Sequence, residues 1–130
     1  MTQDLDIIVE LTPANVRKLV KVLTLLGYRC KLPVNPELIS DSAIRHQWIN
    51  EKNMKVFNFY HKDIPVQEID ILVTAPVKVE SAFKRAIVKR AGKLVIPLVG
   101  LKDLIKMKEA AGRPQDLSDI QMLKLFLKAK

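Results

Sequence analysis

The first third of the chain carries the pattern that most constrains its fold, a short strand that leads directly into a well-delimited helix. Residues 6–10 are rich in Ile and Val, which favour strands. Thr12 supplies an N-cap, Pro13 a first helical residue and Gly27 a left-handed end. Apolar residues recur between them at the spacing of one helix face: Val16, Leu19, Val20, Leu23 and Leu26. The segment therefore predicts a strand followed by an amphipathic helix.

Strand and helix patterns alternate along the rest of the chain as well. Further strands are expected over residues 28–31, 54–60, 66–74 and 93–96, and helices over 40–50, 79–90, 101–111 and 117–127. The loop between 54–60 and 66–74 is short, so these two strands should pair antiparallel as a hairpin. This order predicts an α/β or α+β fold, with a mixed sheet, flanking helices and a helical C-terminus.

Length and composition fit one domain that spans residues 1–130. A chain of 130 residues is typical of a single domain, and 48% hydrophobic residues are enough for a sizeable core. No internal repeat or Gly/Ser linker divides the sequence, so one compact unit is the default expectation. The formal net charge of +8 predicts a surface that attracts polyanions such as nucleotides or RNA.

The sequence also predicts the compartment. No apolar run approaches the roughly 20 residues that a membrane-spanning helix needs, and no cationic region followed by an apolar stretch opens the chain. The single cysteine, Cys30, cannot form an internal disulfide, which fits a reducing environment. We therefore expect a cytoplasmic protein with no membrane partner.

Three aspartates on two of the expected strands form the first candidate site. Asp4 and Asp6 stand two positions apart at the start of the first strand, so their side chains should point to the same face. Asp70 interrupts an apolar alternation on what should be a central strand, where an acidic residue is costly unless it is paired or ligated. Carboxylate oxygens from two strands suit Mg²⁺, which also holds water and substrate phosphate. Asp4, Asp6 and Asp70 are therefore candidate metal ligands and catalytic residues.

These carboxylates also have simpler interpretations. An Asp-x-Asp pair near the start of a chain is common and is usually solvated. Glu68 shares a face with Asp70, and it could be the ligand instead or simply a residue of an edge strand. The combination of Asp4, Asp6 and Asp70 is what favours a metal site.

The second candidate site lies around the break between the last two expected helices. Cations end one helix and Asp116 begins the next, an arrangement that helix-dipole and capping effects explain by themselves. In the functional interpretation, Lys108 and Arg113 point toward a triphosphate held by the metals. Asp116 and Asp119 then cap the helix and orient the two cations.

Together these two sites resemble the nucleotidyltransferase superfamily of the DNA polymerase beta type. The chain is similar to its small bacterial members, which include abortive-infection toxins and the minimal nucleotidyltransferases of toxin–antitoxin pairs, and the resemblance covers nearly the whole chain. Residues 2–9 look like the family's Thr-x-Asp-apolar-Asp strand, and residues 66–72 look like its third-carboxylate strand. The most specific match, residues 104–120, is similar to Leu-Ile-x-x-Lys-x-x-x-x-Arg-x-x-Asp-x-x-Asp-apolar.

The resemblance implies a nucleotidyltransferase-like fold and a reaction that depends on Mg²⁺ (or Mn²⁺). A nucleoside monophosphate would move from a nucleoside triphosphate to a hydroxyl group on RNA, protein or a small molecule. By the match, Asp4, Asp6 and Asp70 are metal ligands, and Asp70 is also a candidate general base. Lys108 and Arg113 are phosphate contacts by the same match.

The chain departs from the family at its N-terminus. Family members carry a helix and a strand before the Asp-x-Asp strand, ending in a Gly-Gly or Gly-Ser turn that grips the nucleotide phosphates, whereas only three residues precede Asp4. We therefore expect a single nucleotidyltransferase-like domain over residues 1–130 that is truncated relative to the family. A missing strand would leave a sheet edge open, and homodimerisation would be one way to cover it.

A non-catalytic function is the alternative to the transferase. A degenerate protein of this fold could bind nucleic acid or a protein partner through its net charge of +8 and the basic residues 84–90 of the expected helix 79–90. Only 5% of the residues are aromatic, which leaves few side chains for base stacking. Both functions therefore stand as hypotheses at this point.

Overall fold

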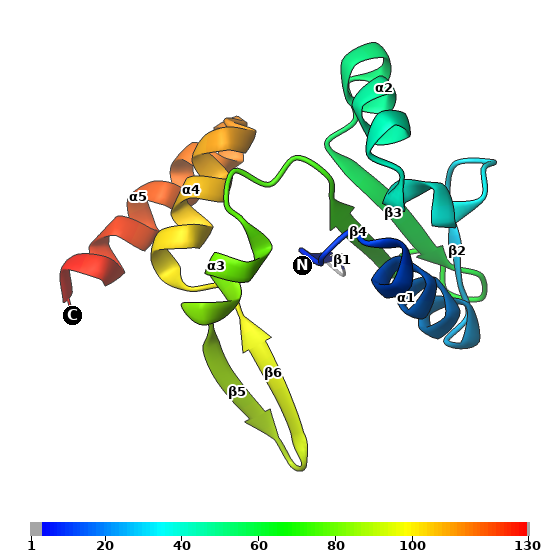
Figure 1. Ribbon diagram of the computed structural model, residues 1–130. Coiled ribbons are helices and arrows are strands. Elements are labelled where there is room, and N and C mark those ends of the chain that lie inside the picture. Colours follow the sequence, from blue (N-terminus) through cyan, green and yellow to red (C-terminus); the bar gives the residue numbers. More distant parts are fainter. Residues whose placement is uncertain (1–3, 130) are drawn as a thin grey trace. The chain divides into compact units, whose positions relative to one another are not determined.

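The computed structural model describes residues 4–129, which form two compact units that divide between Thr74 and Ala75 (Figure 1). These residues contain a four-stranded mixed sheet, a separate two-stranded sheet and five α-helices, the last two of which form the C-terminal part. The predicted mixed α+β fold with a helical C-terminus is thus confirmed. No helix within residues 4–129 combines the length and apolar character that crossing a bilayer requires.

The first unit is built on the four-stranded sheet. Its spatial order is β1 (Asp4–Ile7), β4 (Glu68–Leu72), β3 (Val56–His61) and β2 (Tyr28–Cys30). β1 runs parallel to β4, whereas β4 with β3 and β3 with β2 are antiparallel. The hairpin expected from residues 54–60 and 66–74 is therefore confirmed, and Asp70 lies on a strand with neighbours on both sides.

One face of this sheet carries the hydrophobic core. α1 (Pro13–Leu25), a 3₁₀ turn called η1 (Pro36–Ser40) and α2 (Ser42–Lys52) contribute side chains to it. Because side chains alternate along a strand, every second residue of β3 and β4 enters this core. Its buried members are Val16, Leu23, Ile39, Trp48, Phe57, Phe59, Ile69 and Ile71. Trp48 stacks on Phe57 with ring centroids 5.8 Å apart, which packs α2 against the sheet.

The first two helices begin at their capping residues. The Thr12 hydroxyl accepts a hydrogen bond from the backbone N–H of Asn15 at 3.3 Å, and Pro13 opens α1 as predicted. The Asp41 carboxylate accepts hydrogen bonds from two backbone N–H groups of α2, at 2.9 and 3.2 Å. This cap explains why α2 begins at Ser42, two residues after the expected start.

The second unit consists of helices and one hairpin. Its elements are α3 (Val79–Lys84), β5 (Ile87–Ala91), β6 (Leu94–Leu98), α4 (Leu101–Ala111) and α5 (Pro114–Ala129). α4 has the predicted bounds. α5 begins three residues before its expected start at residue 117, because proline suits the first turn of a helix. Asp116 therefore lies inside the first turn of α5 rather than before it.

The helix predicted over residues 79–90 is wrong in its second half. α3 ends at Lys84, and β5 follows and pairs antiparallel with β6. Gly92 and Lys93 join the two strands, and Gly92 has a φ of +64°. A two-residue turn with glycine in the first central position is typical of a type II′ hairpin turn. This turn, together with the strand-favouring residues at the start of β5, is the signal that the helix prediction missed.

The basic helical surface expected over residues 84–90 is also wrong, because the hairpin replaces part of that helix. Lys84 is the last residue of α3, whereas Lys89 and Arg90 lie on β5. The cations of residues 84–90 therefore do not form one helical stripe. They belong to two different elements of the second unit.

Gly27 ends α1 at a position that should not accept a side chain. Its φ is +95°, and an added Cβ would lie 2.8 Å from Nε2 of His61. That imidazole is held on both sides: Nε2 lies 3.1 Å from the carbonyl oxygen of Leu26, and Nδ1 accepts hydrogen bonds from the backbone N–H groups of Asp63 and Ile64. The glycine and the histidine therefore fix the junction between α1, β2 and the end of β3.

We expect Gly27→Ala to lower the free energy of unfolding of the first unit by about 1–3 kcal/mol, because the variant combines a strained φ with a close contact. The measurement is a denaturant titration of the full chain, followed by the fluorescence of Trp48, the single tryptophan. Gly92→Ala is the control, since Gly92 also has a positive φ but has open space around it and lies in the second unit. An unchanged Trp48 transition in Gly27→Ala would contradict the prediction.

Candidate functional site

Four carboxylates belong to the sheet face opposite the core of the first unit. The parallel register of β1 and β4 places Asp6 opposite Asp70 and Asp4 opposite Glu68. Residues opposite each other in a sheet share a face, and the alternating Ile69 on β4 points into the core. These four residues, Asp4, Asp6, Glu68 and Asp70, are called the acidic face. The structure therefore brings together the aspartates that the sequence places 64 positions apart.

Asn58 of β3 completes this group from the other side of β4. It lies opposite Asp70 in the antiparallel register, and its Nδ2 donates a hydrogen bond to Asp70 Oδ1 at 2.7 Å. The Asn58 Oδ1 atom is buried and accepts no hydrogen bond from the part of the chain that the structure describes. Asn58 thus fixes the orientation of the Asp70 carboxylate and leaves one buried acceptor of its own available.

The chemistry of the acidic face fits a hard cation. Asp6 and Asp70 present oxygen ligands from neighbouring strands, and Mg²⁺ is commonly held by one or two carboxylates with water and substrate phosphate as its other ligands. Across residues 4–129, no group of three His, Cys, Asp or Glu side chains stands at metal-binding spacing. The role of Asp4, Asp6 and Asp70 as a three-carboxylate clamp therefore stays a prediction.

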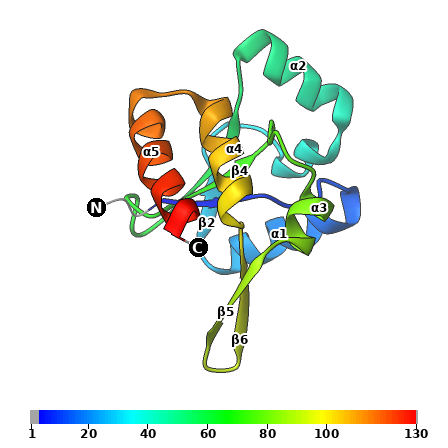
Figure 2. The ribbon, with the colours of Figure 1, turned by 90° about the vertical axis from the view of Figure 1, so that its left-hand side faces the viewer.

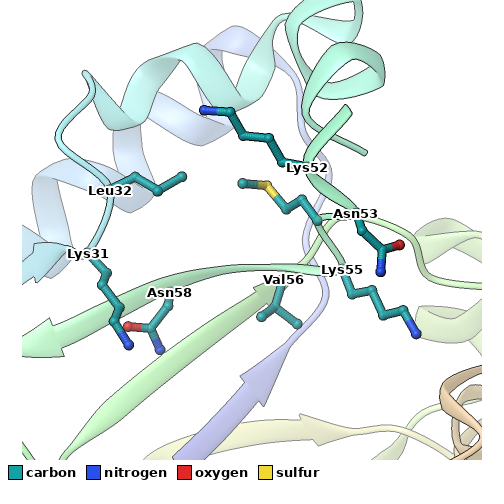
Figure 3. Close-up of a pocket in the computed structure, with 8 residues that line it drawn as sticks. Lys31, Leu32, Lys52, Asn53, Lys55, Val56 and Asn58 are labelled. Carbon is teal, nitrogen blue, oxygen red and sulfur yellow. The ribbon is translucent and has the colours of Figure 1, made fainter. Parts of the chain in front are cut away.

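A basic pocket lies beside Asn58, the residue that contacts Asp70 of the acidic face. The pocket has a volume of about 450 Å³ and is called the lysine pocket; its lining residues are Lys31, Leu32, Lys52, Asn53, Met54, Lys55, Val56 and Asn58. Three of these are cationic and none is acidic. In the view of Figure 3, the ammonium groups of Lys31, Lys52 and Lys55 point to three different sides, and Lys52 lies on the α2 side. This combination of ammonium groups, amides and apolar carbons suits a phosphorylated ligand.

The lysine pocket exists because β2 is short. β2 ends at Cys30, and the backbone N–H of Lys31 donates to the Asn58 carbonyl oxygen at 3.0 Å before the chain turns away. The first residues of β3 therefore have no strand beside them on that side within the described sheet. The end of α2 and the segment after β2 enclose the space that is left.

The predicted phosphate contacts Lys108 and Arg113 lie in the second unit and contact carboxylates there. Lys108 Nζ lies 2.9 Å from Asp119 Oδ2 and 3.7 Å from Asp116 Oδ1. Arg113 donates to Asp116 from its side chain at 2.7 Å and from its backbone N–H at 3.2 Å. Lys108 and Arg113 thus contact the two aspartates expected to orient them. Their contact with phosphate stays a prediction.

A second ion pair anchors α4 to the end of α3. Asp103 is 2% exposed, and its two carboxylate oxygens accept hydrogen bonds from Nε and Nη2 of Arg85, each at 2.9 Å. This fork geometry is the strongest form of carboxylate recognition by arginine. The hydrogen bonds from Arg85 lower the pKa of Asp103 despite its burial. In the same way, the hydrogen bonds from Arg113 lower the pKa of the buried Asp116, and those from Lys108 lower the pKa of Asp119.

Asn58 and the lysine pocket were not identified from the sequence. Asn58 stands between the buried Phe57 and Phe59, so the two-residue alternation already placed it on the other face. Aligning the two strands of the predicted hairpin would then have set it opposite Asp70. The pocket lysines are separated by up to 24 positions and share no motif.

Comparisons with known proteins add no family to this description. No protein-family model matches the chain, and a search of curated proteins found no relative. The nucleotidyltransferase resemblance therefore depends on the residues of the chain itself.

We expect the second unit to lose stability in acid. A carboxylate whose pKa is lowered by folding binds protons more readily in the unfolded state. The stabilisation from Asp103, Asp116 and Asp119 is therefore fully present above the ordinary Asp value of 3.8 and is lost as the pH falls through their lowered values. The measurement is the unfolding of α4 and α5 as a function of pH, followed by the NMR amide signals of these helices.

Asp103→Asn tests the cause of this acid sensitivity. The variant should unfold α4 and α5 at lower denaturant concentration near neutral pH, and the pH dependence below about pH 5 should become shallower. Glu109→Gln is the matched control, because Glu109 is an exposed residue of the same helix. An equally steep pH dependence in Asp103→Asn would show that this ion pair does not cause the effect.

Proposed function

We propose that this chain is a nucleotidyltransferase-like protein that transfers a nucleoside monophosphate from a nucleoside triphosphate to a hydroxyl acceptor, with Mg²⁺ or Mn²⁺. The observation that carries the proposal is the pairing of Asp6 with Asp70 in the β1–β4 register, on the face of the sheet that the core helices leave open. Two carboxylates at one level of neighbouring strands present oxygen ligands on one face of the sheet, and such ligands suit a divalent cation such as Mg²⁺.

The residues of the acidic face have separate tasks in this proposal. Asp6 and Asp70 hold the ion. Asp4 lies on the same face, two positions before Asp6 along β1. When bound, the ion supplies positive charge that favours attack on the α-phosphate and departure of pyrophosphate. Asp70 also receives the proton of the acceptor hydroxyl. Asn58 keeps the Asp70 carboxylate in one orientation through its 2.7 Å hydrogen bond.

The lysine pocket is the proposed site of the phosphate groups. Its three lysines supply positive charge around the space, and the side-chain amides of Asn53 and Asn58 can donate hydrogen bonds to phosphate oxygens. Asn58 lines the pocket and donates a hydrogen bond to Asp70, so this one side chain connects the pocket to the acidic face. The acceptor that this proposal favours is RNA or another hydroxyl-bearing molecule attracted by the net charge of +8.

Asp6→Asn and Asp70→Asn should each weaken the binding of a nucleoside triphosphate in the presence of Mg²⁺ by about tenfold or more, since each removes one anionic ligand. The measurement is isothermal titration calorimetry with the full chain, with and without Mg²⁺, together with pyrophosphate release on adding an acceptor RNA. Glu109→Gln provides the control for a change of charge alone. Binding that is insensitive to Mg²⁺ and to both substitutions would contradict the proposal.

Glu68→Gln tests whether this neighbouring carboxylate, rather than Asp70, is the metal ligand.

The pocket lysines give an independent test. Lys31→Gln with Lys52→Gln should weaken nucleotide binding about fivefold to tenfold at low salt, because two exposed ammonium–phosphate contacts are lost. Lys18→Gln with Lys21→Gln is the matched control, since it removes the same charge from exposed positions of α1. An equal loss in both double variants would show that net charge, rather than the pocket, attracts the nucleotide.

A non-catalytic nucleotide-binding protein is the second candidate, and the lysine pocket favours it as well. In that case the nucleotide binds to the pocket, and its affinity falls when Lys31 and Lys52 are substituted. No pyrophosphate is released with any acceptor. The Asp6 and Asp70 variants separate the two functions. Only the transferase requires both carboxylates for turnover.

A further inference from the structure

The hairpin of the second unit is uncovered along its whole length. All ten residues of β5 and β6 are exposed, and in both Figure 1 and Figure 2 the hairpin extends away from the helices of its own unit. Its large apolar side chains are between 37% and 61% exposed: Ile87, Val88, Leu94, Val95, Ile96 and Leu98. A two-stranded ribbon by itself is marginally stable in water. Apolar exposure of this extent is typical of a surface that another molecule covers.

The two edges of the hairpin are not equivalent. In a two-residue hairpin the closing pair, here Ala91 and Leu94, is hydrogen-bonded, and bonded and non-bonded pairs alternate from there. The non-bonded pairs are Arg90 with Val95 and Val88 with Pro97, and their backbone groups point outward. The outer edge of β5 therefore offers two N–H donors. The outer edge of β6 offers one, because proline has no N–H.

The charge of the hairpin indicates what can add to that edge. Residues 86–98 contain Lys89, Arg90 and Lys93 and no acidic residue. A second copy of this chain would bring the same cations together, which disfavours pairing between copies. Nucleic acid would match the charge, but it would leave the aliphatic faces in water, and the hairpin has no aromatic side chain on which a base could stack.

The two faces of the hairpin indicate which side chains a partner strand should carry. Residues opposite each other share a face, so one face carries Lys89 among aliphatic side chains and the other carries Arg90 among aliphatic side chains. A strand that pairs with β5 would place its own alternate residues on these two faces. Each face of that strand must carry both aliphatic and acidic residues, which requires pairs of aliphatic residues alternating with pairs of acidic residues.

We propose that the outer edge of β5 is a docking site for an extended segment of a partner protein in which pairs of aliphatic residues alternate with pairs of acidic residues. The segment adds a third strand to the hairpin, accepts hydrogen bonds from the outward N–H groups of Val88 and Arg90, and pairs its carboxylates with the hairpin cations. This site is independent of the acidic face and of the nucleotide proposed there.

The test uses the full chain, labelled with ¹⁵N, and a synthetic peptide of repeated Val-Val-Glu-Glu as the probe, which presents valine and glutamate on both of its faces. Binding of the peptide should slow the hydrogen exchange of the Val88 and Arg90 amides at least tenfold and leave the Val95 amide unchanged. A peptide with lysine in place of glutamate should bind at least tenfold more weakly. This measurement needs no variant, so it stands even where a substitution disturbs the hairpin.

Two proline variants test the choice of edge. Val88→Pro removes an outward N–H from β5 and should weaken peptide binding at least tenfold, whereas Val95→Pro removes one from β6 and should change it less than twofold. The cross-strand NMR contacts between β5 and β6 verify that each variant keeps its hairpin.

Several results would overturn the proposal. These are no binding of the glutamate peptide, equal effects of the two proline variants, or protection of Val95 in place of Val88. Protection of Val88 that appears with rising protein concentration alone would assign the edge to a second copy. Tighter binding of an RNA duplex than of the peptide, with loss of both in Val88→Pro, would assign it to nucleic acid.

Discussion

The first unit depends on the alternation of side chains along β4. This strand is the only one of its sheet in the described chain that has both a parallel and an antiparallel neighbour, so its register fixes the positions of β1 and β3 together. Ile69 and Ile71 enter the core, while Glu68 and Asp70 point to the other face. A shift of one residue would bury the carboxylates among Phe57 and its neighbours. The cost of burying carboxylates thus favours the observed register of β4, and this register places the candidate site on the face opposite the core.

In the second unit, by contrast, two carboxylates are buried. Asp103 and Asp116 are each 2% exposed, and each is held by an arginine that reaches it from a neighbouring segment. Burying such a group is favourable only when its hydrogen bonds are complete, because an unpaired charge in the interior is strongly destabilising. The small apolar core of α4 and α5, which includes Ile105 and Ile120, is therefore supplemented by ion pairs.

The sequence predicted those features that neighbouring residues determine. The caps at Thr12 and Gly27, the helix 101–111 and the central position of Asp70 all follow from local patterns and are present in the structure. The error at residues 79–90 arose where an apolar run allowed either helix or strand, and pairing with β6 decided it. The lysine pocket could not be predicted, because a short β2 and the end of α2 create it only after folding. For the acidic face, the sequence predicted the residues, and the register supplied the pairing.

The parallel pairing of β1 with β4 has a consequence for the order in which the first unit can form. Asp6 and Asp70 are 64 positions apart, and the strands between them pair with each other or with their close neighbours. During synthesis the N-terminal strand therefore has no partner until almost the whole unit has left the ribosome, and such long-range contacts form slowly. The two carboxylates come together in the closing step of the sheet. A growing chain thus carries no assembled acidic face, so a cation that needs both aspartates can bind only after the unit is complete.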